Sequence, residues 1–150
     1  MTETRAAAAT VLLWMEWSPE LFRDYVPNGG ADENFAVSTV LRLVSGMNVQ
    51  GIKRKEFSAA SKILHWLMPW RVPIYDRVVR KMLGVPAGPP SEATYRQIVR
   101  WEFDAVNGLL SWGDSWLGVS EPKAALRALD KYLWWTGGGK DSGARGAMSQ

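Results

Sequence analysis

The stretch Ser58–Leu83, SAASKILHWLMPWRVPIYDRVVRKML, decides how this chain folds. Its first half places apolar side chains at helical spacing and stops at Pro69, because the residue before a proline is driven away from helical angles. Beyond Pro73, the side chain of Asp76 stands at the position of a helix N-cap, and a basic, valine-rich helix follows. The stretch therefore predicts two helices joined by a turn that two prolines bracket.

The first of these helices is expected from about Phe57 to Met68, with two chemically different faces. Its apolar face holds Phe57, Ala60, Leu64 and Leu67. Polar side chains gather on another face, which holds Ser58, Ser61, Lys62 and His65. The polar face therefore contains the candidate reactive groups of the stretch.

The same spacing of apolar side chains predicts helices on both sides of this stretch. They are expected over residues 3–17, 19 to about 25, 33 to about 46, 92 to about 110 and 122 to about 136. Ser18, Asp32 and Ser91 stand at N-cap positions, and Gly46 and Gly84 stand at helix ends. The apolar faces of the last two helices include Tyr95, Ile98, Val99, Trp101, Val106, Leu109, Leu126, Leu129, Leu133 and Trp134.

These patterns predict an all-α fold, because no strand-like alternation of apolar and polar residues runs along the chain. We expect one compact domain of six to eight helices over residues 1–136. Residues 137–150 are rich in glycine, serine and alanine, which predicts a disordered C-terminal tail. A chain of 150 residues buries roughly 70% of its unfolded surface, so folding requires neither a metal nor a disulfide.

The composition limits the classes of function. The chain has no cysteine, which excludes disulfides and thiolate chemistry, and one histidine, which excludes a multi-histidine metal site. We therefore expect no metal and no cofactor, and the lack of cysteine fits a cytoplasmic protein. No segment approaches the ~18 apolar residues of a spanning helix, so no membrane partner is expected. The net charge of +3 permits a polyanionic partner such as duplex DNA and leaves the oligomeric state open.

The chain contains nine tryptophans, an unusually high number for its length. Most of them are expected in the core, because each indole ring buries a large apolar area. The alternative is that a few of them line a groove for a flat ligand or a nucleobase. The nine are Trp14, Trp17, Trp66, Trp70, Trp101, Trp112, Trp116, Trp134 and Trp135.

Lys62 is the first candidate for chemistry, because apolar residues adjoin it on both sides in the sequence. A lysine in apolar surroundings loses hydration, which favours the neutral amine over the ammonium ion. A neutral amine is a nucleophile that forms a Schiff base with a sugar C1′ or another carbonyl carbon. The alternative, the commoner case, is a lysine that extends its amine to water from the helix edge.

Asp76 and His65 are the other candidate catalytic residues. Asp76 is expected to cap a helix, a role worth roughly 1 kcal/mol. A carboxylate held there could also stabilise a developing oxocarbenium ion. His65 lies one turn beyond Lys62 and could transfer a proton near neutral pH, although a lone histidine is more often a hydrogen-bonded structural residue.

Two basic clusters flank the pair Lys62 and Asp76 in the sequence. Lys53, Arg54 and Lys55 precede it, and Arg77, Arg80 and Lys81 follow it. If the clusters converge in space they form a phosphate-binding rim, and the alternative is that each is a solvated helix face. No Walker loop, GxGxxG, GxSxG or HExxH motif occurs, so the chemistries that depend on those motifs have no support.

The order of these residues resembles the catalytic core of the helix-hairpin-helix DNA glycosylase superfamily, in particular its bacterial 8-oxoguanine DNA glycosylase-like branch. The features in common are a lysine on a helix, a short apolar connector, and the turn Pro73-Ile74-Tyr75-Asp76 that opens a helix rich in arginine and valine. The segment LDKYLWW, which begins at Leu129, is also similar to a closing helix of uncharacterised bacterial proteins of this kind.

The resemblance implies a base-excision DNA glycosylase, with or without Schiff-base lyase activity. It implies that Lys62 attacks the sugar C1′ and that Asp76 supports cleavage of the glycosidic bond, and it gives no role to residues 129–135. One alternative is a non-enzymatic helical module that binds a protein or a nucleic acid, in which this stretch is purely structural. Another is an enzyme that acts on a small molecule in a tryptophan-rich pocket. A Lys62 amine within reach of the Asp76 carboxylate, beside an open cleft with basic walls, favours the glycosylase.

Overall fold

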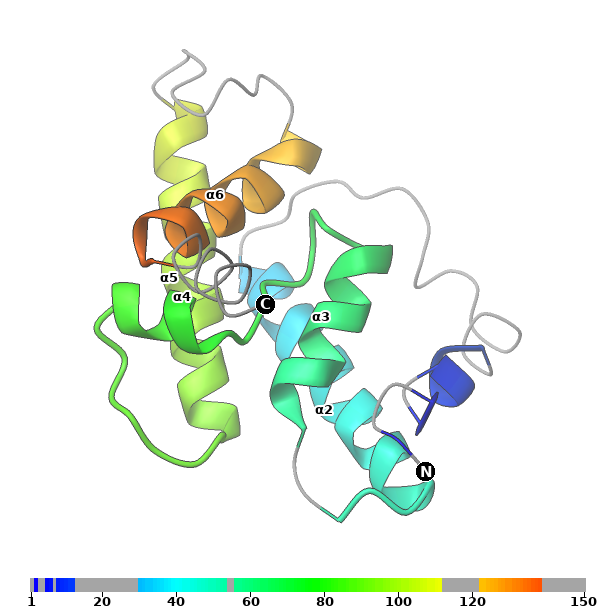
Figure 1. The fold of residues 1–150 in the computed structure, drawn as a ribbon. Helices are drawn as coiled ribbons and strands as arrows, with labels where there is room; N and C mark the ends of the chain where they lie inside the picture. Colours follow the sequence, from blue (N-terminus) through cyan, green and yellow to red (C-terminus); the bar gives the residue numbers. More distant parts are fainter. Residues whose placement is uncertain are drawn as a thin grey trace, which may run out of the picture.

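The computed structural model describes residues 2, 5–6, 8–12, 30–53, 56–111 and 122–138 of the chain (Figure 1). Regular structure within these residues is helical throughout, which confirms the predicted all-α fold. The helices with defined bounds are α2 (Gly30–Val49), α3 (Phe57–Leu67), α4 (Arg77–Met82), α5 (Glu92–Ser111) and α6 (Pro122–Thr136). Residues 5–6 and 8–12 are also helical, in the place of the first predicted helix. The predicted helix from residue 19, and residues 139–150 of the predicted tail, lie outside the described residues.

The helices pack in an order that brings distant parts of the sequence together. α2 packs against both α3 and α5, and α6 packs against α5 and α4. In Figure 1, α6 crosses α5, and α4 lies directly beside α6. As a result, α6 lies next to the turn and the helix that follow α3, although 39 residues lie between α4 and α6 in the sequence.

An aromatic cluster holds α3, the turn before α4, and α5 together. The rings of Phe57, Tyr75 and Tyr95 lie 6.0 to 6.2 Å apart in tilted pairs, and all three side chains are buried. The Tyr95 hydroxyl donates a hydrogen bond of 2.7 Å to the carbonyl of Pro73. Since a buried hydroxyl requires a partner, this bond fixes the turn against α5.

Helix α2 is longer than predicted at both ends. It begins at Gly30, so Asp32 lies in its first turn rather than at its N-cap, and it continues through Gly46 to Val49. A Cβ atom at Gly46 would lie 2.5 Å from Cγ2 of Thr10, so the glycine permits close approach of the N-terminal helical segment and does not end the helix. The chain turns instead at Gly51, whose φ of +95° is a conformation that favours glycine.

The predicted boundaries of the later helices agree closely with the structure. Asp76 caps α4, and its Oδ1 accepts a 2.7 Å hydrogen bond from the backbone N–H of Val78. Gly84 follows α4 with a φ of +66°, and the hydroxyl of Ser91 accepts a hydrogen bond from Thr94 N–H at the start of α5. The prediction of these caps is therefore confirmed.

Several large apolar side chains that were expected in the core are exposed. Leu67, Trp101 and Trp134 lie at the surface, and so do Trp66 and Trp135, while Trp70 is partly buried. None of the five tryptophans within the described ranges is buried, so the expectation of a mainly internal role is wrong for them. The other four lie outside those ranges. No helix in the described part of the chain is both long enough and apolar enough to cross a membrane.

Candidate functional site

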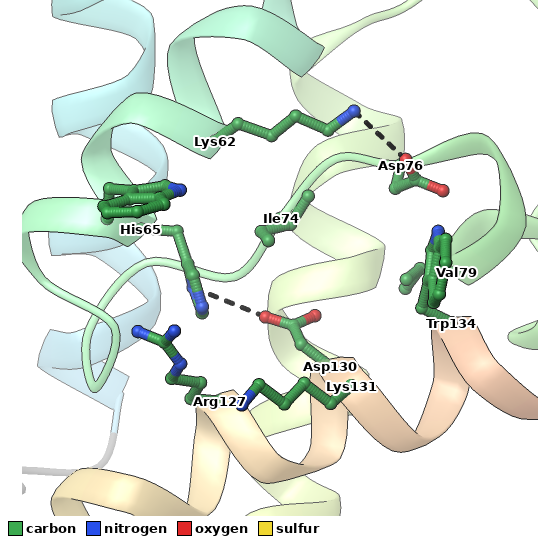
Figure 2. A pocket seen from close by; sticks show the side chains of 10 residues that line it. Lys62, His65, Ile74, Asp76, Val79, Arg127, Asp130, Lys131 and Trp134 are labelled. Atoms are coloured by element: carbon green, nitrogen blue, oxygen red, sulfur yellow. Dashed lines mark ion pairs between the residues drawn. The ribbon is translucent and has the colours of Figure 1, made fainter. Parts of the chain in front are cut away.

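The ends of α3 and α6, the turn before α4 and α4 itself surround a cavity of about 330 Å³ (Figure 2). Its walls combine indole rings, aliphatic side chains, and charged groups of both signs. The lining residues are Lys62, His65, Trp66, Ile74, Asp76, Val79, Arg127, Asp130, Lys131 and Trp134. All three predicted catalytic residues therefore line one pocket.

Lys62 and Asp76 form an ion pair at one side of this pocket. The Nζ atom of Lys62 lies 3.2 Å from Oδ2 of Asp76, while Oδ1 of the same carboxylate caps α4. The N-cap bond fixes the carboxylate, because one oxygen is committed to the backbone and the other is left to face the lysine. A second bond holds the two elements in register, since the hydroxyl of Ser61 accepts a 2.8 Å hydrogen bond from the backbone N–H of Tyr75.

Lys62 does not lie in the apolar surroundings that would favour a neutral amine, and it matches the commoner alternative of a lysine that extends its amine towards water. Its side chain is 49% exposed, and its amine faces a carboxylate. The neighbouring Ala60 and Leu64 point into the core instead, because they lie on the opposite face of α3. Lys62 therefore stands at the solvent side of the pocket as half of an ion pair.

His65 is buried and held by a backbone carbonyl. Its Nδ1 lies 2.7 Å from the carbonyl oxygen of Val72 and 3.4 Å from Oδ2 of Asp130. Burial lowers the pKa of His65, with the bond to Val72 acting in the opposite direction. We assign the neutral tautomer with the proton on Nδ1, because that atom must donate to the carbonyl. His65 thus anchors the turn that carries Asp76, and its Nδ1 proton is already in use.

Asp130 and Glu102 form a buried acidic pair, of which Asp130 adjoins His65, and neither was among the predicted site residues. Burial raises the pKa of Asp130 to about 7, and the Glu102 carboxyl and the Ile74 backbone N–H oppose this rise. Burial and the neighbouring Asp130 raise the pKa of Glu102 well above its usual range. None of the four carboxyl oxygens has a well-aligned hydrogen-bond partner among the described groups, and two carboxyl groups buried together cannot both be ionised at low cost.

A sequence signal for this pair exists. Glu102 falls on the buried face of α5 between Ile98 and Val106, and Asp130 falls on the buried face of α6 between Leu126 and Leu133. An acidic residue at a core position of an amphipathic helix is rare unless it has a partner. Two such positions on separate helices are a signal for a buried carboxyl pair.

The predicted basic clusters do not form the walls of the pocket. Lys53, Arg77 and Lys81 are exposed and do not line it, and Arg54 and Lys55 lie outside the described residues. Arg80 is partly buried and donates hydrogen bonds to the Tyr75 hydroxyl and the Gly88 carbonyl. The cations that do line the pocket, besides Lys62, are Arg127 and Lys131 on α6.

In the part of the chain that the structure describes, no three acidic, histidine or cysteine residues are arranged to hold a metal ion. The pocket instead offers an amine, two carboxyl groups at different depths, and aromatic edges. Comparison with models of protein families, with curated proteins and with solved structures gave no match.

Proposed function

We propose that this protein is a DNA base-excision glycosylase that uses Lys62 as a nucleophile on the sugar of an extruded nucleotide. The observation that supports this most is the 3.2 Å contact between the Lys62 amine and a fixed Asp76 carboxylate at the wall of a pocket. The order lysine, turn and capping aspartate is also what resembles the helix-hairpin-helix glycosylases. A purely structural role requires neither the pocket nor its mixed lining.

The ion pair supplies a route to a nucleophilic amine. An ammonium ion has no free electron pair, so Lys62 must give up a proton before it attacks. Oδ2 of Asp76 is within reach of that proton and becomes neutral on receiving it. The amine lone pair then forms a bond to C1′ while the glycosidic C1′–N bond breaks and its electrons leave with the base. The C1′–O4′ bond then breaks as the C1′=N double bond of the Schiff base forms, and a proton moves from the nitrogen to O4′. A lyase step can proceed from this Schiff base.

The shape and lining of the pocket suit a flat heterocycle. Trp66 on α3 and Trp134 on α6 both contribute to its walls, and Ile74 and Val79 supply aliphatic surface. The Trp66 side chain is 79% exposed, which is unusual for an indole and favours a role in stacking. An enzyme that acts on a base in duplex DNA must rotate it out of the stack into such a pocket.

The phosphate contacts of this proposal fall to cationic side chains. The glycosylase superfamily anchors phosphates with a Leu-Pro-Gly-x-Gly type hairpin before the lysine, and residues 54–61 contain no glycine. Arg127 and Lys131 on α6 line the pocket, and the exposed Arg77 and Lys81 lie on the adjacent α4. Neutralisation of phosphates by these four side chains would supply sequence-independent affinity for DNA.

The test is trapping of the Schiff base. Borohydride treatment of the protein with a duplex that contains one abasic site should yield a covalent adduct on a denaturing gel. Lys62→Gln should abolish the adduct, because it removes the nucleophile. Lys131→Gln removes the other lysine of the same pocket and should still give the adduct at saturating duplex.

The result also separates the two main functional alternatives. Lack of any adduct from the unmodified protein would remove the Schiff-base mechanism. Binding of duplex DNA without an adduct would support the non-enzymatic helical module instead. Equal loss of the adduct in the Lys62 and Lys131 variants would show that positive charge, and not the Lys62 amine, is what the reaction requires.

A further inference from the structure

The buried carboxyl pair Glu102 and Asp130 is the feature of this pocket that the Lys62 chemistry leaves unexplained. Glu102 has no exposed surface, and the Asp130 side chain is only 5% exposed. Of the two, Asp130 lines the pocket, and Glu102 lies behind it on α5. Two carboxyl groups buried together cannot both be ionised at low cost, so the pair retains a proton.

The polar groups of the pocket are graded by depth. Lys62 is 49% exposed and Asp76 is 17% exposed, whereas His65 and Asp130 are 7% and 5% exposed. Figure 2 shows the Lys62–Asp76 contact at one side, the His65–Asp130 contact at the other, and Ile74 between them. A nucleotide whose C1′ reaches the Lys62 amine would therefore direct its base towards Asp130.

Charged and titratable groups face Asp130, or line the pocket with it, from each element that surrounds it. They are Lys62 and His65 on α3, Asp76 before α4, Tyr95 and Glu102 on α5, and Arg127 and Lys131 on α6. The three cations are exposed, and the uncharged His65 offers only a shared Nδ1 proton. Burial and the negative charge at Asp76 therefore favour the acid form of Asp130, whereas the hydrogen bond with the Glu102 carboxyl acts in the opposite direction.

We propose that Asp130 is the general acid of this site, which protonates the base as it leaves, and that Glu102 is the positioning residue that holds it. This inference rests on the proposed glycosylase function. A base that departs with the electron pair of its glycosidic bond carries negative charge unless it gains a proton. Asp130 lies at the end of the pocket where the base would lie, and Lys62 lies at the end where the sugar would lie.

The groups in the pocket account for the electron pair and the proton that move in this step. The glycosidic bond breaks, its electron pair moves to the base, and the Asp130 proton moves to a ring nitrogen or a carbonyl oxygen of that base. Asp130 is left as a carboxylate, which the neutral Glu102 carboxyl can stabilise as a hydrogen-bond donor. Water entering after the base leaves returns the proton, because the pKa of Asp130 of about 7 lies near the ambient pH.

The test separates base release from Schiff-base formation. Single-turnover base release is measured from pH 5 to 9 on two duplexes, one with a single 8-oxoguanine and one with a single uracil. Borohydride trapping on an abasic duplex is measured in parallel, because that substrate has already lost its base. The full chain is compared with Asp130→Asn and with Asp104→Asn, which changes an exposed carboxylate on the same helix as Glu102.

Base release by the unmodified protein should fall above about pH 7, by up to tenfold per pH unit. Asp130→Asn should slow base release by about a hundredfold, the low end of the usual contribution of a general acid, and should remove this pH dependence. It should still form the abasic adduct, which shows that the variant is folded and retains Lys62 chemistry. Asp104→Asn should behave like the unmodified protein in both measurements.

Three results would overturn the assignment, and they are distinguishable. If the unmodified protein forms no abasic adduct, the proposed function fails and the role of Asp130 fails with it. If the adduct forms but Asp130→Asn releases base as fast as the unmodified protein, the role of Asp130 alone is wrong. An adduct without base release from either duplex by the unmodified protein would also exclude a general acid at this position.

Glu102 is tested by the pH profile, which a merely structural role would not move. Glu102→Leu removes the donor to Asp130, so the acid form persists to higher pH and the alkaline limit of base release should move upward. Glu102→Gln retains a donor and should keep that limit near its original position. An unchanged profile in Glu102→Leu would remove the positioning role and leave the Asp130 assignment to its own test.

Discussion

At the scale of single residues, burial decides what each ionisable group can do. Lys62 and Asp76 keep access to water and can exist as an ion pair at modest cost. Glu102 and Asp130 have almost no access to water, so the fold favours their protonated forms. The carboxyl group at the mouth of the pocket therefore pairs with a lysine, whereas the carboxyl groups at its buried end favour the acid form.

The buried acids predict a stability that falls as the pH rises. The folded state holds a proton on Asp130 up to about pH 7, whereas the unfolded chain releases it near pH 4, so raising the pH across that window favours unfolding. The slope contributed by one such proton is at most about 1.4 kcal/mol per pH unit. Asp130→Asn should therefore reduce the decline in unfolding free energy between pH 4 and pH 7, as measured by urea denaturation.

His65 contributes with the opposite sign. Because burial lowers the pKa of His65, the unfolded chain binds a proton more readily, and stability is lost as the pH falls below about 6.5. Its contribution therefore opposes that of Asp130 as the pH falls below about 6.5. A decline between pH 4 and pH 7 that is the same in Asp130→Asn as in the unmodified protein would show that this carboxyl holds no proton in the folded state.

At the scale of elements, local sequence signals predicted the caps of α4 and α5 and most of the buried helix faces, but not the bounds of α2. The Asp76 and Ser91 caps depend on backbone chemistry within three residues, so the sequence alone specifies them. Gly46 continues its helix because a distant Thr10 packs against it, and that contact leaves no local signal. Asp130 was missed for a similar reason, since its partners lie on α3 and α5 and no pairing is visible from α6 alone.

The side chain of Ser61 links α3 to the turn before α4. Ser61→Ala leaves the buried backbone N–H of Tyr75 without its acceptor, which should cost roughly 1–3 kcal/mol of unfolding free energy in denaturant titrations. It should also slow abasic-site trapping, because this bond holds the Asp76 turn in register with Lys62. Ser58 enters the same network through its backbone carbonyl, so Ser58→Ala should leave both quantities nearly unchanged.

At the scale of the whole molecule, the pocket exists only because two segments that are distant in the sequence meet. α3 and the turn after it provide Lys62, His65 and Asp76. α6 provides Asp130 and the two cations Arg127 and Lys131. The packing of α6 against α4 and α5 is what converts the Ser58–Leu83 stretch into the side of a cavity. Lys62 and Asp76 could therefore be selected from sequence, while the depth and charge of the site required the tertiary structure.

This arrangement predicts which face of the molecule meets DNA. Arg127 and Lys131 lie one turn apart on α6 at the exposed wall of the pocket, so a duplex that delivers a base there must pass beside them. Each phosphate contact contributes about 0.9 to the slope of log affinity against log salt concentration. The double variant Arg127→Gln with Lys131→Gln should therefore lower that slope by about 2 in fluorescence-anisotropy titrations with a fluorescein-labelled abasic duplex. Arg5→Gln, at an exposed position of the N-terminal helical segment, should leave it unchanged. A slope that instead responds to Lys53→Gln and not to the α6 variant would place the duplex along the loop after α2, away from the Lys62 pocket.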